Sequence, residues 1–318
     1  MNVLVTGANG FVGSALINDL MTNSSYRAVA AARASEFLPK DVSYINVKGL
    51  SNSTDWSSAL ANVSIVIHTA ARVHIMKDKV GETLNEYRKV NVEGTLNLAR
   101  QSAKSGVKRF IFISSIKVNG ESTTNRNSFN ELDDVSPIDP YGQSKWEAEK
   151  GLQSISIETG MEVVIIRPPL VYGPQVKANF HNLLKLAKTG LPLPFGAIQN
   201  LRSTVFIGNL VDFIVNCIDH PNAANETFLI SDGEDLSISM LLMQLRSDMG
   251  IPPRLIPVPK SLFMLAGKIL GKSDVVARLC GSLQVDSTKA QQLLGWVAPY
   301  TVQHGLKVTV DNFLKIND

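Results

Sequence analysis

Tyr141 and Lys145 stand four residues apart in the segment Asp-Pro-Tyr-Gly-Gln-Ser-Lys, which begins at residue 139. On a helix this spacing places both side chains on one face, one turn apart. A free tyrosine ionises near pH ~10, so it is a poor base at neutral pH. A fixed positive charge nearby favours the phenolate and lowers this pKa. The pair therefore predicts proton transfer to or from an alcohol or a ketone, although the same spacing also occurs where tyrosine only packs on a lysine stem.

A glycine-rich segment near the N-terminus predicts a dinucleotide site. The sequence Thr-Gly-Ala-Asn-Gly-Phe-Val-Gly at 6–13 follows an apolar run and precedes a helical pattern. Its glycines allow a tight turn, close approach of the backbone to a pyrophosphate, and close packing of helix on sheet. The helix N-terminus would then offer amide donors to the phosphates. We expect cofactor contacts from Gly7, Asn9, Gly10, Phe11, Val12 and Gly13.

Arg33 stands where dinucleotide sites usually carry an acidic residue for the ribose 2′-hydroxyl, about 20 residues after the glycine loop. A guanidinium there could bind the 2′-phosphate of NADP, stack on the adenine, or be solvated. An arginine at this position therefore favours NADP, and the sequence is compatible with either NADP or NAD.

These side chains depend on a sheet to bring them together. Short apolar runs alternate with helical patterns in the first half of the chain, which predicts a Rossmann-type doubly wound parallel sheet of the α/β class. The predicted strands are 2–6, 27–32, 43–47, 64–69, 109–114 and 162–167, and the predicted helices are 12–22, 55–60, 84–105 and 141–158. Asp139 followed by Pro140 suits the start of the last helix.

Prolines interrupt the second half of the chain, which predicts a looser lobe. We expect a dinucleotide-binding Rossmann domain at 1–167 and a mainly substrate-binding lobe at 168–318, with some segments of the lobe returning to the sheet.

The composition argues against several other classes. A net charge of +3 with dispersed basic residues disfavours nucleic acid as the main partner. Cys217 and Cys280 are the only cysteines and lack metal-ligand spacing, so neither a disulfide framework nor a metal site is expected. The apolar stretch 261–270 is too short to span a bilayer. We expect a cytoplasmic protein that binds neither nucleic acid nor membrane.

As a set, the motifs resemble the extended short-chain dehydrogenase/reductases of the nucleotide-sugar epimerase/dehydratase group. They occur in family order over nearly the whole chain. The matching segments are the glycine loop, His-Thr-Ala-Ala at 68–71, Asn-Val-Glu-Gly-Thr at 91–95, Phe-Ile-Phe-Ile-Ser-Ser at 110–115, the Tyr141–Lys145 pair, Arg-Pro-Pro-Leu-Val-Tyr-Gly-Pro at 167–174 and Asp-x-x-Lys-Ala at 286–290. The resemblance implies NAD or NADP, a nucleotide sugar that is UDP-linked, and a homodimer formed through the helices at 84–105 and 141–158.

The resemblance also implies roles for single residues. Ser115 would hydrogen-bond the reacting oxygen, Tyr141 would be the acid and base, and Lys145 would bind the nicotinamide ribose while lowering the tyrosine pKa. His68 would offer backbone rather than imidazole chemistry near the cofactor. Further cofactor contacts are implied for Ala70, Ala71, Asn91 and Pro168, and substrate contacts for Ser115, Asn179, Phe180, Leu193, Phe195, Arg202 and Arg278.

Two of these residues can be described further. Asn91 shares a helical face with Leu84, Tyr87 and Leu98, so it is expected to point toward the sheet rather than water. Arg202 is the best candidate for a diphosphate contact, because a guanidinium fork suits phosphate oxygens.

The motifs leave two reactions open. Family 4,6-dehydratases carry an Asp-Glu pair after the active-site serine or threonine, and Ile116-Lys117 stands there instead, which argues against water elimination. The leading hypothesis is an epimerase acting at C4 of a UDP-hexose or UDP-N-acetylhexosamine. The alternative is an NADPH-dependent 4-reductase of a UDP-4-keto-6-deoxy-hexosamine in surface polysaccharide synthesis. A non-catalytic dinucleotide-binding protein is disfavoured, because Ser115, Tyr141 and Lys145 are all present.

Overall fold

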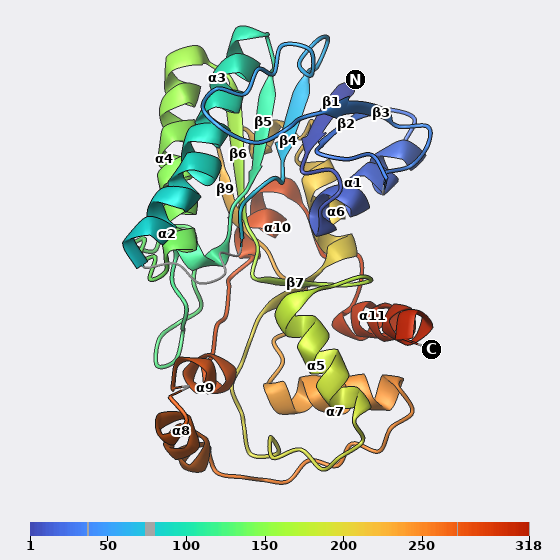
Figure 1. The fold of residues 1–318 in the computed structure, drawn as a ribbon, viewed down its shortest axis with the longest axis vertical. Helices are drawn as coiled ribbons and strands as arrows, with labels where there is room; N and C mark the ends of the chain where they lie inside the picture. The colour runs from blue at the N-terminus through green and yellow to red at the C-terminus, as the bar shows by residue number, and fades with distance from the viewer. Residues whose placement is uncertain (37, 74–79, 272, 318) are drawn as a thin grey trace.

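A parallel sheet of seven strands forms the upper part of the molecule (Figure 1). The computed structural model of the chain describes residues 1–36, 38–73, 80–271 and 273–317. The strand order is β3-β2-β1-β4-β5-β6-β9, so the order reverses between β1 and β4. The strands are β1 (Asn2–Thr6), β2 (Arg27–Ala32), β3 (Ser43–Asn46), β4 (Ile65–His68), β5 (Arg109–Ile113), β6 (Glu162–Arg167) and β9 (Thr227–Leu229). Ligands of such sheets bind beyond the carboxyl ends of the strands at the point of reversal.

Helices cover both faces of the sheet, which explains why the strands are continuous apolar runs. On one face lie α1 (Phe11–Thr22), α6 (Ile207–Asn216) and α10 (Thr288–Leu294), packed on Val3 and Val5 of β1. On the other lie α3 (Thr95–Lys104) and α4 (Pro140–Thr159), packed on Leu4. Alternate residues of each strand therefore enter different cores.

Further helices lie in the lower part of the molecule (Figure 1). A two-stranded parallel sheet, β7 (Leu170–Tyr172) with β8 (Thr204–Phe206), leads into it. The helices there are α5 (Ala178–Lys188), α7 (Ile238–Asp248), α8 (Lys260–Ile269), α9 (Ser273–Cys280) and α11 (Val302–Asn317). Within the described part of the chain, every helix is too short or too polar to traverse a bilayer.

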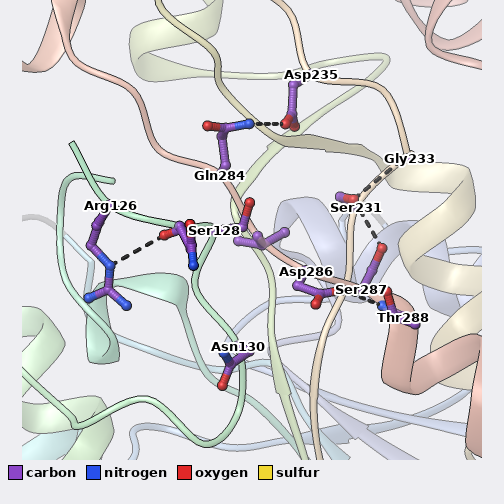
Figure 2. A pocket seen from close by; sticks show the side chains of 12 residues that line it. Arg126, Ser128, Asn130, Ser231, Gly233, Asp235, Gln284, Asp286, Ser287 and Thr288 are labelled. Carbon is purple, nitrogen blue, oxygen red and sulfur yellow. Dashed lines mark hydrogen bonds between the residues drawn. The ribbon is translucent and has the colours of Figure 1, made fainter. Parts of the chain in front are cut away.

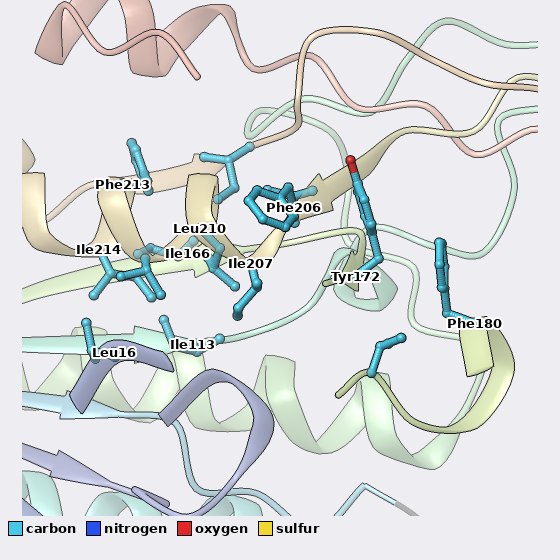
Figure 3. Packing of buried hydrophobic residues seen from close by; sticks show 14 of the residues in the cluster. Leu16, Ile113, Ile166, Tyr172, Phe180, Phe206, Ile207, Leu210, Phe213 and Ile214 are labelled. Carbon is cyan, nitrogen blue, oxygen red and sulfur yellow. The ribbon is translucent and has the colours of Figure 1, made fainter. Parts of the chain in front are cut away.

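One hydrophobic core runs from the sheet into the lower part. Figure 3 shows Ile214 of α6 directed toward Leu16 of α1, in a cluster that continues through Ile166 of β6 to Tyr172 and Phe180. The ring of Phe213 is fully buried, and its centroid lies 5.3 Å from that of Phe228 and 4.9 Å from that of Trp296. Edge-to-face rings at these distances stabilise a core beyond the area they bury.

The predicted fold class is confirmed, and all six predicted strands form. The seventh strand, β9, comes from the second half of the chain and pairs with β6, so this part of the lobe does return to the sheet. The helix predicted at 55–60 is wrong, because these residues form a turn. The helix predicted at 84–105 is divided into α2 (Val80–Tyr87), a π-helical segment η1 (Arg88–Gly94) and α3. Two short 3₁₀ turns, η2 (Ile116–Val118) and η3 (Pro221–Ala223), complete the elements.

Replacing Phe213 with Ala should lower the free energy of unfolding by about 3–5 kcal/mol, because it leaves a cavity between Phe228 and Trp296. Ile157→Ala, at a residue 86% exposed on α4, is the matched control and should change it by less than about 0.5 kcal/mol. Urea unfolding curves of the two variants measure this difference, and equal midpoints would contradict the role given to Phe213.

Candidate active site

The predicted catalytic residues are carried by elements that meet at the carboxyl edge of the sheet. Ser115 lies two residues beyond β5, and Tyr141 and Lys145 lie in the first two turns of α4. Asp139 caps α4 as predicted, since its Oδ1 accepts a hydrogen bond from the Gly142 amide at 2.6 Å. A Cβ atom on Gly142 would lie 2.7 Å from the carbonyl oxygen of Lys117, so glycine is what allows α4 to approach η2 this closely.

Lys117, which replaces a dehydratase carboxylate, has a structural role here. Its ammonium forms ion pairs with Asp139, the capping residue of α4, and with Glu121 at 3.3 Å. The lysine thus connects η2 to the start of α4. This contact explains how a lysine is accommodated beside Ser115.

The ammonium of Lys145 is buried beneath the site. Its Nζ donates a hydrogen bond to the carbonyl oxygen of Ile113 at 2.7 Å and lies 4.3 Å from the ring centroid of Phe112. Burial lowers the pKa of Lys145 to about 7, although the carboxylate of Glu149 acts in the opposite direction. An ammonium has three donors, so the bond to Ile113 orients the group while further donors can serve a ribose.

The expected lowering of the Tyr141 pKa is not found in the protein alone, which corrects the prediction. Burial raises the pKa of the Tyr141 phenol, and the nearby Asp139 and Tyr87 raise it further. Lys145 Nζ is 6.0 Å from the phenol ring centroid and is directed to a backbone carbonyl. Desolvation therefore outweighs the lysine charge, and a phenolate at neutral pH would require additional positive charge from a bound ligand.

Ser115 is positioned by the turn that follows it. Its backbone is extended, and its Oγ accepts a hydrogen bond from the Lys117 amide at 3.3 Å as the N-cap of η2. A hydroxyl that accepts one hydrogen bond still carries its own proton as a donor. Ser115 can therefore donate to an oxygen atom in the site.

The glycine loop has the geometry of a dinucleotide cradle. Gly7 has a φ of +70°, and a Cβ atom there would lie 2.8 Å from the backbone of Ala70. A Cβ atom on Gly13 would overlap the carbonyl of Gly7, so the start of α1 packs directly on the loop. Among the described residues, no side chain caps the N-terminus of α1, where Gly10 is the N-cap. The backbone amides are thus free to receive phosphate oxygens.

The other predicted cofactor residues surround this loop. Arg33 is exposed just beyond β2, Ala70 and Ala71 follow β4, and Pro168 follows β6, where its carbonyl accepts from the Ile116 amide at 3.0 Å. Asn91 is buried, as predicted. Its Nδ2 donates to the Arg72 carbonyl and to Ser144 Oγ, both at 3.0 Å, while its Oδ1 accepts from the Arg72 amide at 2.8 Å. Asn91 thus connects η1 to the loop after β4 and to α4.

His68 is held as a neutral imidazole. It is fully buried, with Nδ1 at 2.6 Å from Thr6 Oγ1 and Nε2 at 2.9 Å from Thr95 Oγ1. Burial, and secondly the charge of Lys145, lower the pKa of His68 to about 3. A group that stays neutral and enclosed cannot act as a base, in agreement with the expectation that its imidazole does no chemistry.

A buried polar network behind the catalytic residues was missed from the sequence. The Glu149 carboxylate pairs with the Arg167 guanidinium at 2.6 Å and accepts a hydrogen bond from Ser114 Oγ. Arg167 also donates to Asn119 Oδ1 at 3.0 Å. The available signal was that Glu149 stands one helical turn after Lys145 and must share its buried face.

The predicted substrate residues divide into buried and accessible side chains. Phe180 and Leu193 are 1% and 5% exposed, and Phe180 stacks on Tyr172 in the core. Both side chains are apolar and pack in the hydrophobic core. Asn179 is exposed and Phe195 is half-buried.

Arg202 contacts the backbone of the segment that carries Arg278. The Arg202 guanidinium donates to the carbonyl oxygens of Arg278 at 2.8 Å and Gly281 at 3.0 Å. Burial lowers the pKa of Arg202, while the carboxylate of Glu121 raises it. The group is therefore held in place by the backbone.

A polar groove opens at the same edge of the molecule, between the loop after β5 and the segment entering α10. Figure 2 shows Arg126, Ser128 and Asn130 on one side and Ser231, Ser287 and Thr288 on the other. Ser115, Tyr141 and Lys145 do not line this groove. Among the described residues, no cluster of histidine, cysteine and acidic side chains is arranged to hold a metal ion.

Comparison with known proteins agrees with this geometry. Residues 3–231 match the model of the NAD dependent epimerase/dehydratase family. The chain is also 50% identical over its whole length to the UDP-glucose 4-epimerase of Vibrio cholerae, of which it covers 97%. The chain belongs to the NAD dependent epimerase/dehydratase family. The resemblance inferred from the motifs, and with it the enzyme class, is confirmed.

Other members of this family extend the comparison. An N-acetyl-α-D-glucosaminyl-diphospho-ditrans,octacis-undecaprenol 4-epimerase of Escherichia coli O157:H7 is 32% identical over 97% of the chain and 94% of its own length. The crystal structure of UDP-glucose 4-epimerase with UDP-glucose from Thermotoga maritima matches with a TM-score of 0.76 and 25% identity over all of both chains. A UDP-glucuronic acid 4-epimerase from Bacillus cereus in complex with NAD shares the fold, with a TM-score of 0.80 at 24% identity over all of both chains.

The burial of Lys145 predicts a pH-dependent stability in the cofactor-free protein. The pKa of this group is about 7 when folded and 10.5 in its ordinary state, so between these values the unfolded chain binds more protons. Stability from this group must then rise with pH across this window, by up to about 5 kcal/mol at ~1.4 kcal/mol per pKa unit. Below pH 7 both states are protonated and the effect is flat.

The measurement is the free energy of urea unfolding of the wild type minus that of Lys145→Met, between pH 6 and about 10. This difference in the free energy of unfolding should become more positive as pH rises from about 7 to about 10. Lys104→Met, at an exposed position on α3, controls for the general effect of removing a lysine. A pH-independent difference for Lys145→Met would contradict the burial of a titrating ammonium.

Proposed function

We propose that this protein is an NAD-dependent 4-epimerase of UDP-linked hexoses. The observation that carries the proposal is the presence of Ser115, Tyr141 and Lys145 on elements that meet at the carboxyl edge of the sheet, in a chain 50% identical to a UDP-glucose 4-epimerase. The catalytic roles of these residues, the cofactor contacts and the substrate contacts are parts of this proposal. So are a homodimer, a cytoplasmic location, and a division into a cofactor domain at 1–167 and a substrate lobe at 168–318.

The residues of the site suit oxidation and reduction at a sugar carbon. A bound nicotinamide cofactor would supply the hydride acceptor and donor for C4 of the sugar. Tyr141 removes the proton of the 4-hydroxyl and later gives it back, and Ser115 donates a hydrogen bond to the same oxygen. The Lys145 ammonium stabilises the phenolate once the site is filled. Inversion follows when the 4-keto sugar turns over before it is reduced.

A sugar diphosphate carried by a polyprenol is a second candidate substrate. The E. coli relative named for such a substrate is 32% identical over nearly the whole chain. A UDP-sugar and a polyprenyl-diphosphate sugar share the hexose and the diphosphate. The guanidinium of Arg202, held by two backbone carbonyls, suits the part that they have in common.

The 4-ketoreductase remains the alternative reaction, because of Arg33. An epimerase must keep its cofactor through the catalytic cycle, whereas a reductase must exchange it. Nucleotide released from the denatured, purified protein separates the two. Retained NAD supports epimerisation, and an empty site that binds NADPH supports reduction.

Tyr141→Phe should reduce UDP-glucose to UDP-galactose conversion by about 10²–10⁴-fold, because it removes the acid–base group. Nucleotide binding should persist, since the substitution leaves the glycine loop intact. Tyr26→Phe, which removes a surface phenol bonded to Asp219, is the matched control and should keep full turnover. An active Tyr141→Phe enzyme would overturn the mechanism.

Arg33→Ala tests the preference for NADP. If the guanidinium binds a 2′-phosphate, the variant should lose about tenfold or more in NADPH affinity, since a hydrogen bond to a charged group is worth roughly 1.5–3 kcal/mol. Affinity for NADH should change by less than about twofold. Fluorescence titration measures both constants, and an equal change in the two would show that Arg33 does not select the cofactor.

A further inference from the structure

The outer face of α8 is apolar and exposed. Leu262, Leu265 and Ile269 are spaced three and four residues apart and therefore share one face of the helix. They are 53%, 55% and 74% exposed. A helix on a globular surface ordinarily turns such a stripe toward the core. Here Phe263 points inward instead and stacks on Phe195, with ring centroids 5.5 Å apart.

The apolar surface continues beyond α8. Leu193 forms backbone hydrogen bonds with Arg254 and Ile256, which brings the loop after α5 beside the segment that precedes α8. Figure 1 places α8 and α9 at the lower end of the molecule, with these two segments along its lower edge. We call the exposed apolar residues of this region the apolar tip: Leu191, Ile256, Leu262, Leu265, Ile269, Leu270 and Val275.

The sequence around the apolar tip is basic. Residues 249–280, which include α8 and α9, have a net charge of +4, whereas the whole chain has +3, so the rest of the chain has −1. Lys260 and Lys268 stand at the two ends of α8, and both are exposed. The charges of this segment come from Arg254, Lys260, Lys268, Lys272, Asp274 and Arg278.

We propose that the apolar tip docks on the surface of an anionic lipid bilayer. An interfacial helix places its apolar side chains at the boundary between headgroups and acyl chains, and its lysines against anionic headgroups. Lysine stems can lie along the apolar surface while the ammonium groups stay in water. A second copy of this chain fits this surface less well, because its own apolar tip carries positive charge and would be repelled.

The position of the apolar tip connects it to the substrate side of the molecule. The Arg202 guanidinium donates to the carbonyls of Arg278 and Gly281, at the end of α9. Asn200 Nδ2 also donates to Leu279 and Gly281. The docking helices are thus fixed to the region proposed to bind diphosphate. Docking itself does not rest on the proposed function, and turnover of a soluble UDP-sugar is measured independently of it.

Vesicle flotation of the full-length protein tests the proposal. The protein should float with vesicles of phosphatidylethanolamine and phosphatidylglycerol and much less with vesicles of phosphatidylcholine. Raised salt should weaken binding to the anionic vesicles, because it screens exposed charges. A protein that floats with neither composition would overturn the proposal.

Variants of α8 separate the apolar and the charged contributions. Leu265→Glu/Ile269→Glu should abolish flotation. Lys260→Glu/Lys268→Glu should weaken vesicle binding by about 25-fold or more, since each basic residue near an anionic surface contributes roughly fivefold. The matched control is Leu132→Glu/Val297→Glu, which changes two exposed apolar residues elsewhere (94% and 65% exposed) and should float like the wild type.

Folding of each variant is checked by its thermal unfolding and by turnover of soluble UDP-glucose. The proposal falls if a folded Leu265→Glu/Ile269→Glu variant floats like the wild type, or if the control loses binding to the same extent. Light scattering supplies a further criterion. If the wild type is an oligomer that the Leu265→Glu/Ile269→Glu substitutions dissociate, the apolar tip is an interface between copies and the proposal is wrong.

Discussion

The buried ion pair between Glu149 and Arg167 determines where α4, which carries Tyr141 and Lys145, lies on the sheet. Arg167 ends β6, Glu149 belongs to α4, and Ser114 joins the pair from the end of β5. Such a pair is stable only because its remaining polar atoms are bonded, and the loss of one partner would leave a buried charge alone. The distance between Tyr141 on α4 and Ser115 after β5 is thus set by a contact that takes no part in the reaction.

Two close approaches of the backbone complete this arrangement. Gly142 lets α4 meet η2, and Gly7 lets the cofactor loop meet the backbone at Ala70. The first contact joins two elements on the same side of the sheet reversal, and the second joins the ends of β1 and β4 across it. A Cβ atom at either glycine would lie only 2.7 or 2.8 Å from backbone atoms of the neighbouring element, so a side chain there would force the two elements apart.

The strands of the sheet could be predicted because they are buried on both faces, which requires an uninterrupted apolar run. The three-residue strands β7, β8 and β9 could not, since runs of that length occur throughout any folded chain. The segment 55–60 has a helical pattern because Trp56, Ala59 and Leu60 face the core, but a turn buries the same side chains. The local sequence pattern therefore predicted which residues are buried more reliably than it predicted their backbone conformation.

Local sequence pattern is limited in the same way at the candidate site. Spacing and resemblance identified Tyr141, Lys145 and Ser115, and the cap at Asp139 followed from local preference. The environment that controls their protonation could not be obtained in this way. Lys145 meets the carbonyl of Ile113 and the ring of Phe112 through tertiary packing, and burial of Tyr141 reverses the expected direction of its pKa.

The π-helical segment Arg88–Gly94 has a consequence for how this chain can vary in length. Asn91 within it binds the loop after β4 and Ser144 of α4, and Thr95 directly after it binds His68. Deleting a single residue here would rotate α3 by about 100° relative to α2 and break one contact or the other. Insertions and deletions among natural relatives should therefore avoid these seven residues, even where the amino acids themselves change.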